Sequence, residues 1–193
     1  MSYILPGALD ELSYPLFADI KSQFGFVPNF YRAQTMRPEL IEAQAQLVNA
    51  ILIRESALTR KQKEYIFLVC SAANLSTYCV TAHCEIIKLL GIEGPEPEQI
   101  AIDYTASSLP IGTKALLSFA AKLNDEPTKI SKADVDTLRT FGYDDSQIHE
   151  TVLMVGLAKF ANYVSFGLGT VPDFEPRIKF PKKEAGGAAS PVL

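Results

Sequence analysis

The sequence lacks the features that mark nucleic-acid-binding, secreted and membrane-spanning proteins. Its 193 residues carry a formal net charge of -4 without a clustered face of lysine and arginine, so nothing predicts a nucleic-acid partner. The opening residues, MSYILPGALDEL, have no basic segment ahead of an apolar one, and we expect no secretory signal. No apolar run reaches the roughly 20 residues that span a bilayer. We therefore expect a soluble, cytoplasmic protein with no membrane partner.

Cofactor motifs are also missing. There is no glycine-rich phosphate loop, no G-x-S-x-G elbow and no dinucleotide fingerprint. Cysteine is scarce, and the odd number of three argues against a disulfide framework and fits a reducing compartment. Cys79, His83 and Cys84 have no second ligand cluster at a familiar zinc spacing. We expect neither a metal nor another cofactor.

What the sequence has is apolar helix, because 48% of it is hydrophobic and no segment alternates as a strand does. The residues Thr59-Arg60-Lys61-Gln62 match a capping box, and Gly25 and Gly91 follow two helical patterns as C-terminal stops. We expect helices at 13–24, 39–53, 59–73, 76–91, 98–105, 110–123, 131–142 and 148–166, and a short one opening at Asn29. In 39–53 the predicted buried stripe is Leu40, Ala43, Leu47, Ala50 and Ile51.

These helices predict one all-α, multihelical domain over residues 1–180. Two Ala-Asn pairs, Ala73-Asn74 and Ala161-Asn162, each follow an acid and an apolar stretch, which indicates two weakly related helical halves. Residues 181–193, PKKEAGGAASPVL, are small and polar and lack large apolar anchors before their last two positions. They predict a flexible tail or one that packs on a partner subunit.

Chemistry-bearing residues concentrate between Glu64 and Leu90. Cys79 lies three positions after Ser76, a candidate N-cap, where the helix dipole favours a thiolate. His83 follows one helical turn later on the same face, so the thiol and the imidazole could exchange a proton. If the two helices pack antiparallel, Glu64 returns to this face as a proton acceptor.

The same residues also have ordinary structural interpretations. A buried cysteine and a lone histidine on an apolar helix are commonly core residues, and Ser76 alone is a more natural cap than a nucleophile. Three others are expected to do no chemistry. Cys70 falls among core residues, Cys84 points away around the helix, and His149 lies in an acid-rich turn at the surface.

The spacing Glu64-x11-Ser76-x-x-Cys79-x3-His83 resembles the signature of the alkylhydroperoxidase D-like and carboxymuconolactone decarboxylase superfamily. In the redox branch the pattern is Glu-x11-Cys-x-x-Cys-x3-His. Gly25 to Asn29 and Asn162 to Gly169 resemble the early turn and late helix of its peroxidase-related branch. The resemblance covers most of residues 13–173. It implies an all-helical domain that forms trimers or hexamers, with a cofactor-free site near subunit contacts.

The departure from that pattern is Ser76, which stands where the redox branch has its first cysteine, so no Cys-x-x-Cys disulfide can form. By resemblance Glu64, Cys79 and His83 remain. Three hypotheses follow. The first is a one-cysteine peroxidase that reduces small hydroperoxides with an external thiol, Ser76 donating a hydrogen bond. The second is a non-redox, decarboxylase-like enzyme that uses Glu64 and His83. The third is a degenerate oligomeric binding or scaffold protein.

Overall fold

The computed structural model describes residues 2–4, 14–178 and 180, and within them the chain is helical without a strand. The α-helices are α1 (Pro15–Phe24), α2 (Asn29–Arg32), α3 (Pro38–Val48), α4 (Arg60–Ala73), α5 (Thr77–Leu89), α6 (Pro97–Asp103), α7 (Ile111–Asp125), α8 (Lys132–Thr140) and α9 (Asp145–Leu168). A π-helical turn, Asn49–Ile53, continues α3, and a 3-10 turn, Pro127–Lys129, follows α7. The predicted all-α fold is confirmed. The predicted helix 39–53 includes the π-helical turn, and the 3-10 turn has no counterpart among the predicted helices.

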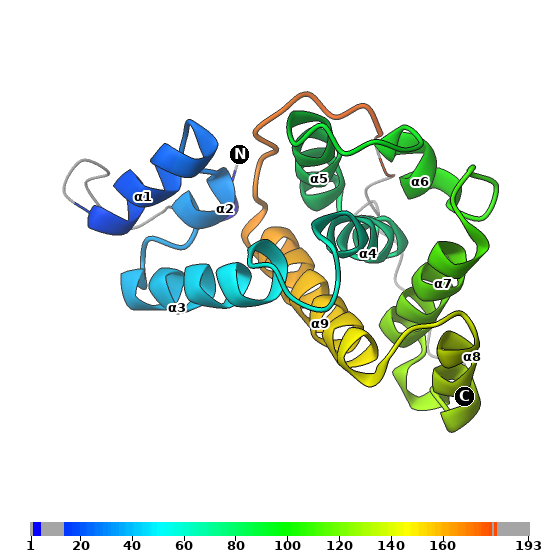
Figure 1. The fold of residues 1–193 in the computed structure, drawn as a ribbon. Coiled ribbons are helices and arrows are strands. Elements are labelled where there is room, and N and C mark those ends of the chain that lie inside the picture. The colour runs from blue at the N-terminus through cyan, green and yellow to red at the C-terminus, as the bar shows by residue number, and fades with distance from the viewer. Residues whose placement is uncertain (1, 5–13, 179, 181–193) are drawn as a thin grey trace, which may run out of the picture.

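Helix α4 is the centre of the molecule. All of its residues from Lys63 to Ala72 are buried, and it packs against α5, α6, α7 and α9 (Figure 1). A helix that is apolar around its whole circumference has to be covered on every side. It begins at the predicted capping box, in which Thr59 Oγ1 accepts the Gln62 N–H at 3.2 Å and Gln62 Oε1 accepts the Thr59 N–H at 2.9 Å.

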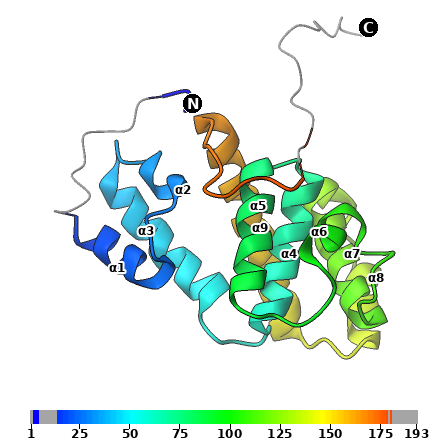
Figure 2. The same ribbon diagram turned by 90° about the horizontal axis from the view of Figure 1, so that it is seen from above.

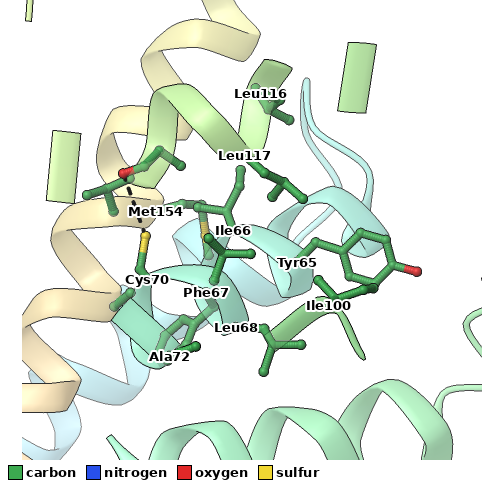
Figure 3. Packing of buried hydrophobic residues seen from close by; sticks show 14 of the residues in the cluster. Tyr65, Ile66, Phe67, Leu68, Cys70, Ala72, Ile100, Leu116, Leu117 and Met154 are labelled. Carbon is green, nitrogen blue, oxygen red and sulfur yellow. Dashed lines mark hydrogen bonds between the residues drawn. The ribbon is translucent and has the colours of Figure 1, made fainter. Parts of the chain in front are cut away.

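The main core forms where α4, α7 and α9 meet. Ile66 of α4, Leu116 and Leu117 of α7 and Met154 of α9 are all fully buried in it (Figure 3). Each such side chain stabilises the fold by about 1.5–3 kcal/mol relative to an exposed one. Cys70 belongs to this core, as predicted.

Helices α1–α3 have a small core of their own, made by Phe17, Ile20, Val27, Tyr31 and Ile41. They gather on one side of the molecule while α4–α9 form the other, an arrangement visible from two directions (Figures 1 and 2). The predicted buried stripe on α3 is wrong. Leu40 and Leu47 are each 45% exposed, and Ile41 is the fully buried residue instead, because α3 packs towards α1 and α2 on that face.

The segment after α9 links the two sides of the molecule. It runs past α2 and over α5 (orange to red in Figure 1). The carboxylate of Asp173 accepts the Asn29 N–H at 2.9 Å and the Tyr78 hydroxyl at 2.7 Å. Asn29 Nδ2 donates to the Val171 carbonyl at 3.1 Å. Three segments distant in sequence are thereby fixed beside the start of α5.

Helix α9 is long and apolar enough, by length and composition, to cross a membrane. It also packs against α4, α5 and α7, and nine of its residues, from Ile148 to Ser165, are buried. That burial is typical of a core helix. The Asn residues of the two Ala-Asn pairs meet at α9, where Asn74 Nδ2 donates to Asn162 Oδ1 at 2.8 Å. The predicted tail, 181–193, lies outside the described residues.

Candidate active site

The site begins at the tight turn between α4 and α5. Helix α4 ends at Ala73, as the sequence predicted, with Asn74 as its C-cap. Leu75 then adopts φ 59°, the left-handed region that costs a branched side chain energy. The Ser76 N–H returns to the Ser71 carbonyl at 2.9 Å. This turn reverses the chain, so that α5 packs back along α4 and brings residues of both helices together.

The first result of this packing is a buried acid–imidazole pair. Glu64 Oε2 lies 2.6 Å from His83 Nδ1, and Glu64 Oε1 accepts the Arg60 Nε–H at 2.7 Å. The side chain of Glu64 is fully buried. Burial alone would raise its pKa, but the charges and hydrogen bonds of His83 and Arg60 outweigh burial and lower the pKa of this carboxyl.

His83 is therefore held in a defined orientation. An ionised Glu64 can only accept, so the proton between them is on Nδ1 and the network assigns Nε2 as the nitrogen free for chemistry. The ring of Phe67 stacks on the imidazole at 3.8 Å between centroids and 20° between planes. Glu64 therefore contacts this face of α5, as the antiparallel packing of the two helices predicted.

Neutral side chains that form hydrogen bonds surround the Cys79 sulfur. Its sulfur is 3.7 Å from Ser165 Oγ of α9, and hydrogen bonds with Ser76, Asn162 and Ser71 also reach it. The side chain is only 3% exposed. Burial raises the pKa of the Cys79 thiol, while the four hydrogen bonds oppose that rise. The sequence predicted a stabilised thiolate, whereas in this closed environment desolvation outweighs the helix N-terminus.

Ser76 has a different role from the one that its position predicted. It is the N-cap residue of α5, but its side chain makes no capping hydrogen bond. It is 1% exposed, and its hydroxyl bonds to Cys79 instead. The residue at the first-cysteine position of the motif therefore contacts the second one, as a hydrogen-bonding neighbour of the thiol.

Among the described residues, no hydrogen bond joins the Cys79 sulfur to the His83 ring. His83 Nδ1 is occupied by Glu64, and the sulfur by hydroxyl and amide groups. Both side chains line one cavity. The direct Cys79–His83 contact that the helical spacing predicted is absent, and a substrate atom that contacts both groups could carry a proton between them.

The other candidate residues are structural. Burial raises the pKa of Cys70 to about 12, and its thiol points to the Ala120 carbonyl (Figure 3). Burial also raises the pKa of Cys84 to about 12, and this side chain faces a small hollow beside Glu98 and Arg177, outside the cavity. His149 is exposed, as predicted.

The cavity has a volume of about 460 Å³ and lies between the α2–α3 side and the α5–α9 side of the molecule. Phe30, Tyr31, Leu47 and Val48 line one wall, and Cys79, Ala82, His83, Ile86, Leu157 and Phe160 line the other. Apolar and aromatic side chains predominate, as in sites for organic ligands. Arg60 is the only lysine or arginine among the lining residues.

Sequence analysis missed three contributors to the site. Arg60 precedes Glu64 by one turn of α4, and that i,i+4 spacing was a usable signal. Ser165 and Ser71 come to Cys79 from α9 and α4, and only the tertiary packing brings them there. Asn162, noted in the sequence as part of an internal echo, is fully buried and donates to Ser71 Oγ at 2.9 Å. Within the described residues no group of three or more His, Cys, Asp or Glu side chains could hold a metal ion.

Comparison with known proteins gives structural relatives only. No protein-family model and no curated protein matches the sequence. An uncharacterized peroxidase-related protein from Ralstonia eutropha, described as an alkylhydroperoxidase AhpD core, is 25% identical with a TM-score of 0.80 over 89% of this chain and 92% of that one. An uncharacterized peroxidase-related protein from Silicibacter sp. is also 25% identical, with a TM-score of 0.81 over 92% and 93%.

A third similar structure is the debrominase Bmp8 in complex with 2,3,4-tribromopyrrole, at 18% identity and a TM-score of 0.74 over 90% of this chain and 92% of that one. At that identity the likeness is one of fold. The two neighbours at 25% identity are peroxidase-related proteins, one of them described as an AhpD core, and they support the superfamily resemblance that the motif indicates.

Proposed function

We propose that this protein is a thiol-dependent peroxidase that reduces organic hydroperoxides through the single cysteine Cys79. The observation that carries the proposal is that the thiol and the Glu64-held imidazole of His83 open onto one apolar cavity. A hydroperoxide there would contact both groups at once. The resemblance to peroxidase-related proteins supports the same chemistry.

In the reaction, the Cys79 sulfur attacks the terminal oxygen of the hydroperoxide as the O–O bond breaks. The thiol proton reaches Nε2 of His83 through the peroxide oxygen that contacts both groups, and Glu64 stabilises the resulting imidazolium. The imidazolium then gives that proton to the departing alkoxide. The products are an alcohol and a sulfenic acid on Cys79, so the sulfur is oxidised by two electrons and the peroxide reduced by two.

The sulfenic acid has to be reduced from outside. Cys70 lies in the core and Cys84 faces away from the cavity, so neither is within reach as a resolving thiol. Two equivalents of an external thiol return Cys79 to its thiol and yield a disulfide and water. The hydrogen bonds from Ser76, Ser165, Ser71 and Asn162 hold the thiolate and the sulfenate as negative charge develops on the sulfur.

The test is turnover of cumene hydroperoxide with dithiothreitol as reductant. Cys79→Ser should lower turnover by about 100-fold or more, the loss typical of removing a catalytic group. The matched control is the Cys70→Ser/Cys84→Ser double variant, which should keep turnover within about twofold because neither thiol faces the cavity. Undiminished turnover in Cys79→Ser would rule out the proposal.

A second candidate is acid–base chemistry without redox, on a small lactone or keto acid. The observation in its favour is that the Glu64–His83 pair is complete without Cys79, while burial keeps the thiol protonated. Activity that survives alkylation of Cys79 but disappears in His83→Ala would favour this candidate over the peroxidase.

A further inference from the structure

Arg60 is a cation in the wall of a cavity that is otherwise mainly apolar. Its side chain is 29% exposed, pairs with the buried Glu64 and lines the cavity. The other charged lining residue with fixed partners is Asp173, whose two oxygens are taken by Asn29 and Tyr78. Of the charged groups that line the cavity, Arg60 therefore has the greater capacity to bind a ligand.

The guanidinium of Arg60 is only partly used. Its Nε donates to Glu64 Oε1, and no hydrogen bond within the described residues involves its two terminal nitrogens. Glu64 pairs with both Arg60 and His83, because Oε1 contacts Arg60 and Oε2 contacts His83. The terminal N–H groups form the planar edge that pairs with a carboxylate through two parallel hydrogen bonds.

We propose that Arg60 binds the carboxylate of an amphipathic organic acid whose hydrocarbon part fills the cavity. The volume of about 460 Å³ and the lining by Phe30, Val48, Ile86 and Phe160 suit an aliphatic or aromatic body much larger than hydrogen peroxide. This deepens the proposed function and rests on it in one respect: the physiological substrate becomes a hydroperoxide of an apolar carboxylic acid. The binding itself needs no redox step.

The competing explanation is that Arg60 serves only to keep Glu64 ionised. In that case its loss would change the binding of acids and of uncharged ligands alike. Two ligands with the same chain separate the explanations, because decanoate and 1-decanol differ only in the head group that would meet Arg60. A variant that disturbs the whole cavity weakens both ligands, so the ratio of the two affinities is insensitive to such a disturbance.

The experiment is titration calorimetry of the intact protein with decanoate and with 1-decanol. Wild type should bind decanoate at least about tenfold more tightly, as expected for hydrogen bonds between charged groups. Hexanoate should bind more weakly than decanoate, by about fourfold for each methylene removed from an apolar site. In Arg60→Gln the preference for the acid should disappear, and in Arg60→Lys it should fall part of the way.

Lys132→Gln is the control, since it removes the same charge from an exposed position of α8 and should leave the preference unchanged. The proposal is overturned if wild type binds acid and alcohol equally, if Arg60→Gln keeps the preference, or if it weakens both ligands equally. If Arg60→Gln does not fold, the affinity ratio of decanoate to 1-decanol in wild type and in Arg60→Lys still tests the proposal.

Failure of this inference differs from failure of the peroxidase proposal. The same titration in Cys79→Ser measures carboxylate binding in a protein that cannot carry out the thiol reaction. If decanoate is preferred but no hydroperoxide is reduced, the binding site stands and the peroxidase fails. If cumene hydroperoxide is reduced but carboxylates are not preferred, the peroxidase stands and this inference fails.

Discussion

At the scale of single residues, the groups that contact the thiol differ from the groups that hold the imidazole, although the motif spacing alone would pair Cys79 directly with His83. Neutral donors, Ser76, Ser165, Ser71 and Asn162, surround the Cys79 sulfur, while the charged groups Glu64, His83 and Arg60 form their own network. The hydrogen bonds favour the Cys79 thiolate but do not outweigh burial, which raises the thiol pKa. The imidazole handles protons that pass through the substrate.

The pKa of Cys79 should respond to its neutral donors. Because burial raises that pKa, thiolate should form with a midpoint above the ordinary value of about 8.5. In Ser165→Ala the midpoint should rise further, since a hydrogen bond to the charged form is lost. Ultraviolet absorbance of the thiolate, corrected with Cys79→Ser, measures it. Ser107→Ala, a buried serine elsewhere, is the control, and equal midpoints in all three proteins would refute this role of Ser165.

Glu64 should make stability depend on acid pH. Its pKa is lower when folded than when unfolded, so its contribution is present above the unfolded value and is lost as pH falls through the folded value. At pH 7, Glu64→Gln should lower the free energy of unfolding by about 3–5 kcal/mol, as for a broken buried pair. The difference should shrink below about pH 4.3. Urea unfolding across this range tests it, with the exposed Glu126→Gln as control; a gap independent of pH would contradict the account.

At the scale of elements, the sequence predicted helices well where local signals define them. The Thr59 cap and the Gly25 stop coincide with helix ends, and Gly91 follows the C-cap of α5 with φ 61°. The buried face of α3 could not be predicted in this way. Its apolar residues occur on more than one face, and the choice of Ile41 depends on where α1 and α2 pack.

The turn between α4 and α5 carries local strain at Leu75. Asn tolerates the left-handed conformation better than Leu, for which it costs about 1–2 kcal/mol. Leu75→Asn should therefore raise the free energy of unfolding by about 1 kcal/mol. Leu40→Asn is a matched control, because both leucines are 45% exposed but Leu40 is helical, and it should not stabilise. Thermal unfolding of both variants measures this, and a destabilised Leu75→Asn would contradict the explanation.

At the scale of the whole molecule, apolar side chains remain uncovered on α9. Val152, Phe160, Tyr163 and Phe166 are 42–63% exposed at spacings that share one helix face. The superfamily resemblance leads us to expect a second copy of the chain against such a face, in a trimer or hexamer.

Tyr163→Asp and Phe166→Asp should therefore shift the protein towards monomer in sedimentation velocity at micromolar concentration, because a charge in an apolar contact is costly. Ile111→Asp on α7, where the side chain is 71% exposed, serves as control and should not change the mass. A wild-type monomer, or variants that sediment as wild type does, would contradict the expectation.

How far the site follows from the sequence depends on distance along the chain. Glu64, Ser76, Cys79 and His83 fall within twenty residues and could be identified by spacing. Ser165 is 86 positions from Cys79, and the walls of the cavity come from α2, α3, α5 and α9. Such contacts depend on how helices cross, and so does the balance between burial and hydrogen bonds that sets the pKa of Cys79.

The central claim is that Cys79 alone carries the reducing electrons. The most direct measurement treats the Cys70→Ser/Cys84→Ser variant with one equivalent of cumene hydroperoxide and no reductant, then traps sulfenic acid with dimedone for mass spectrometry. The account predicts one alcohol formed per protein and one dimedone adduct on Cys79. Intact hydroperoxide with an unmodified Cys79 thiol would contradict it.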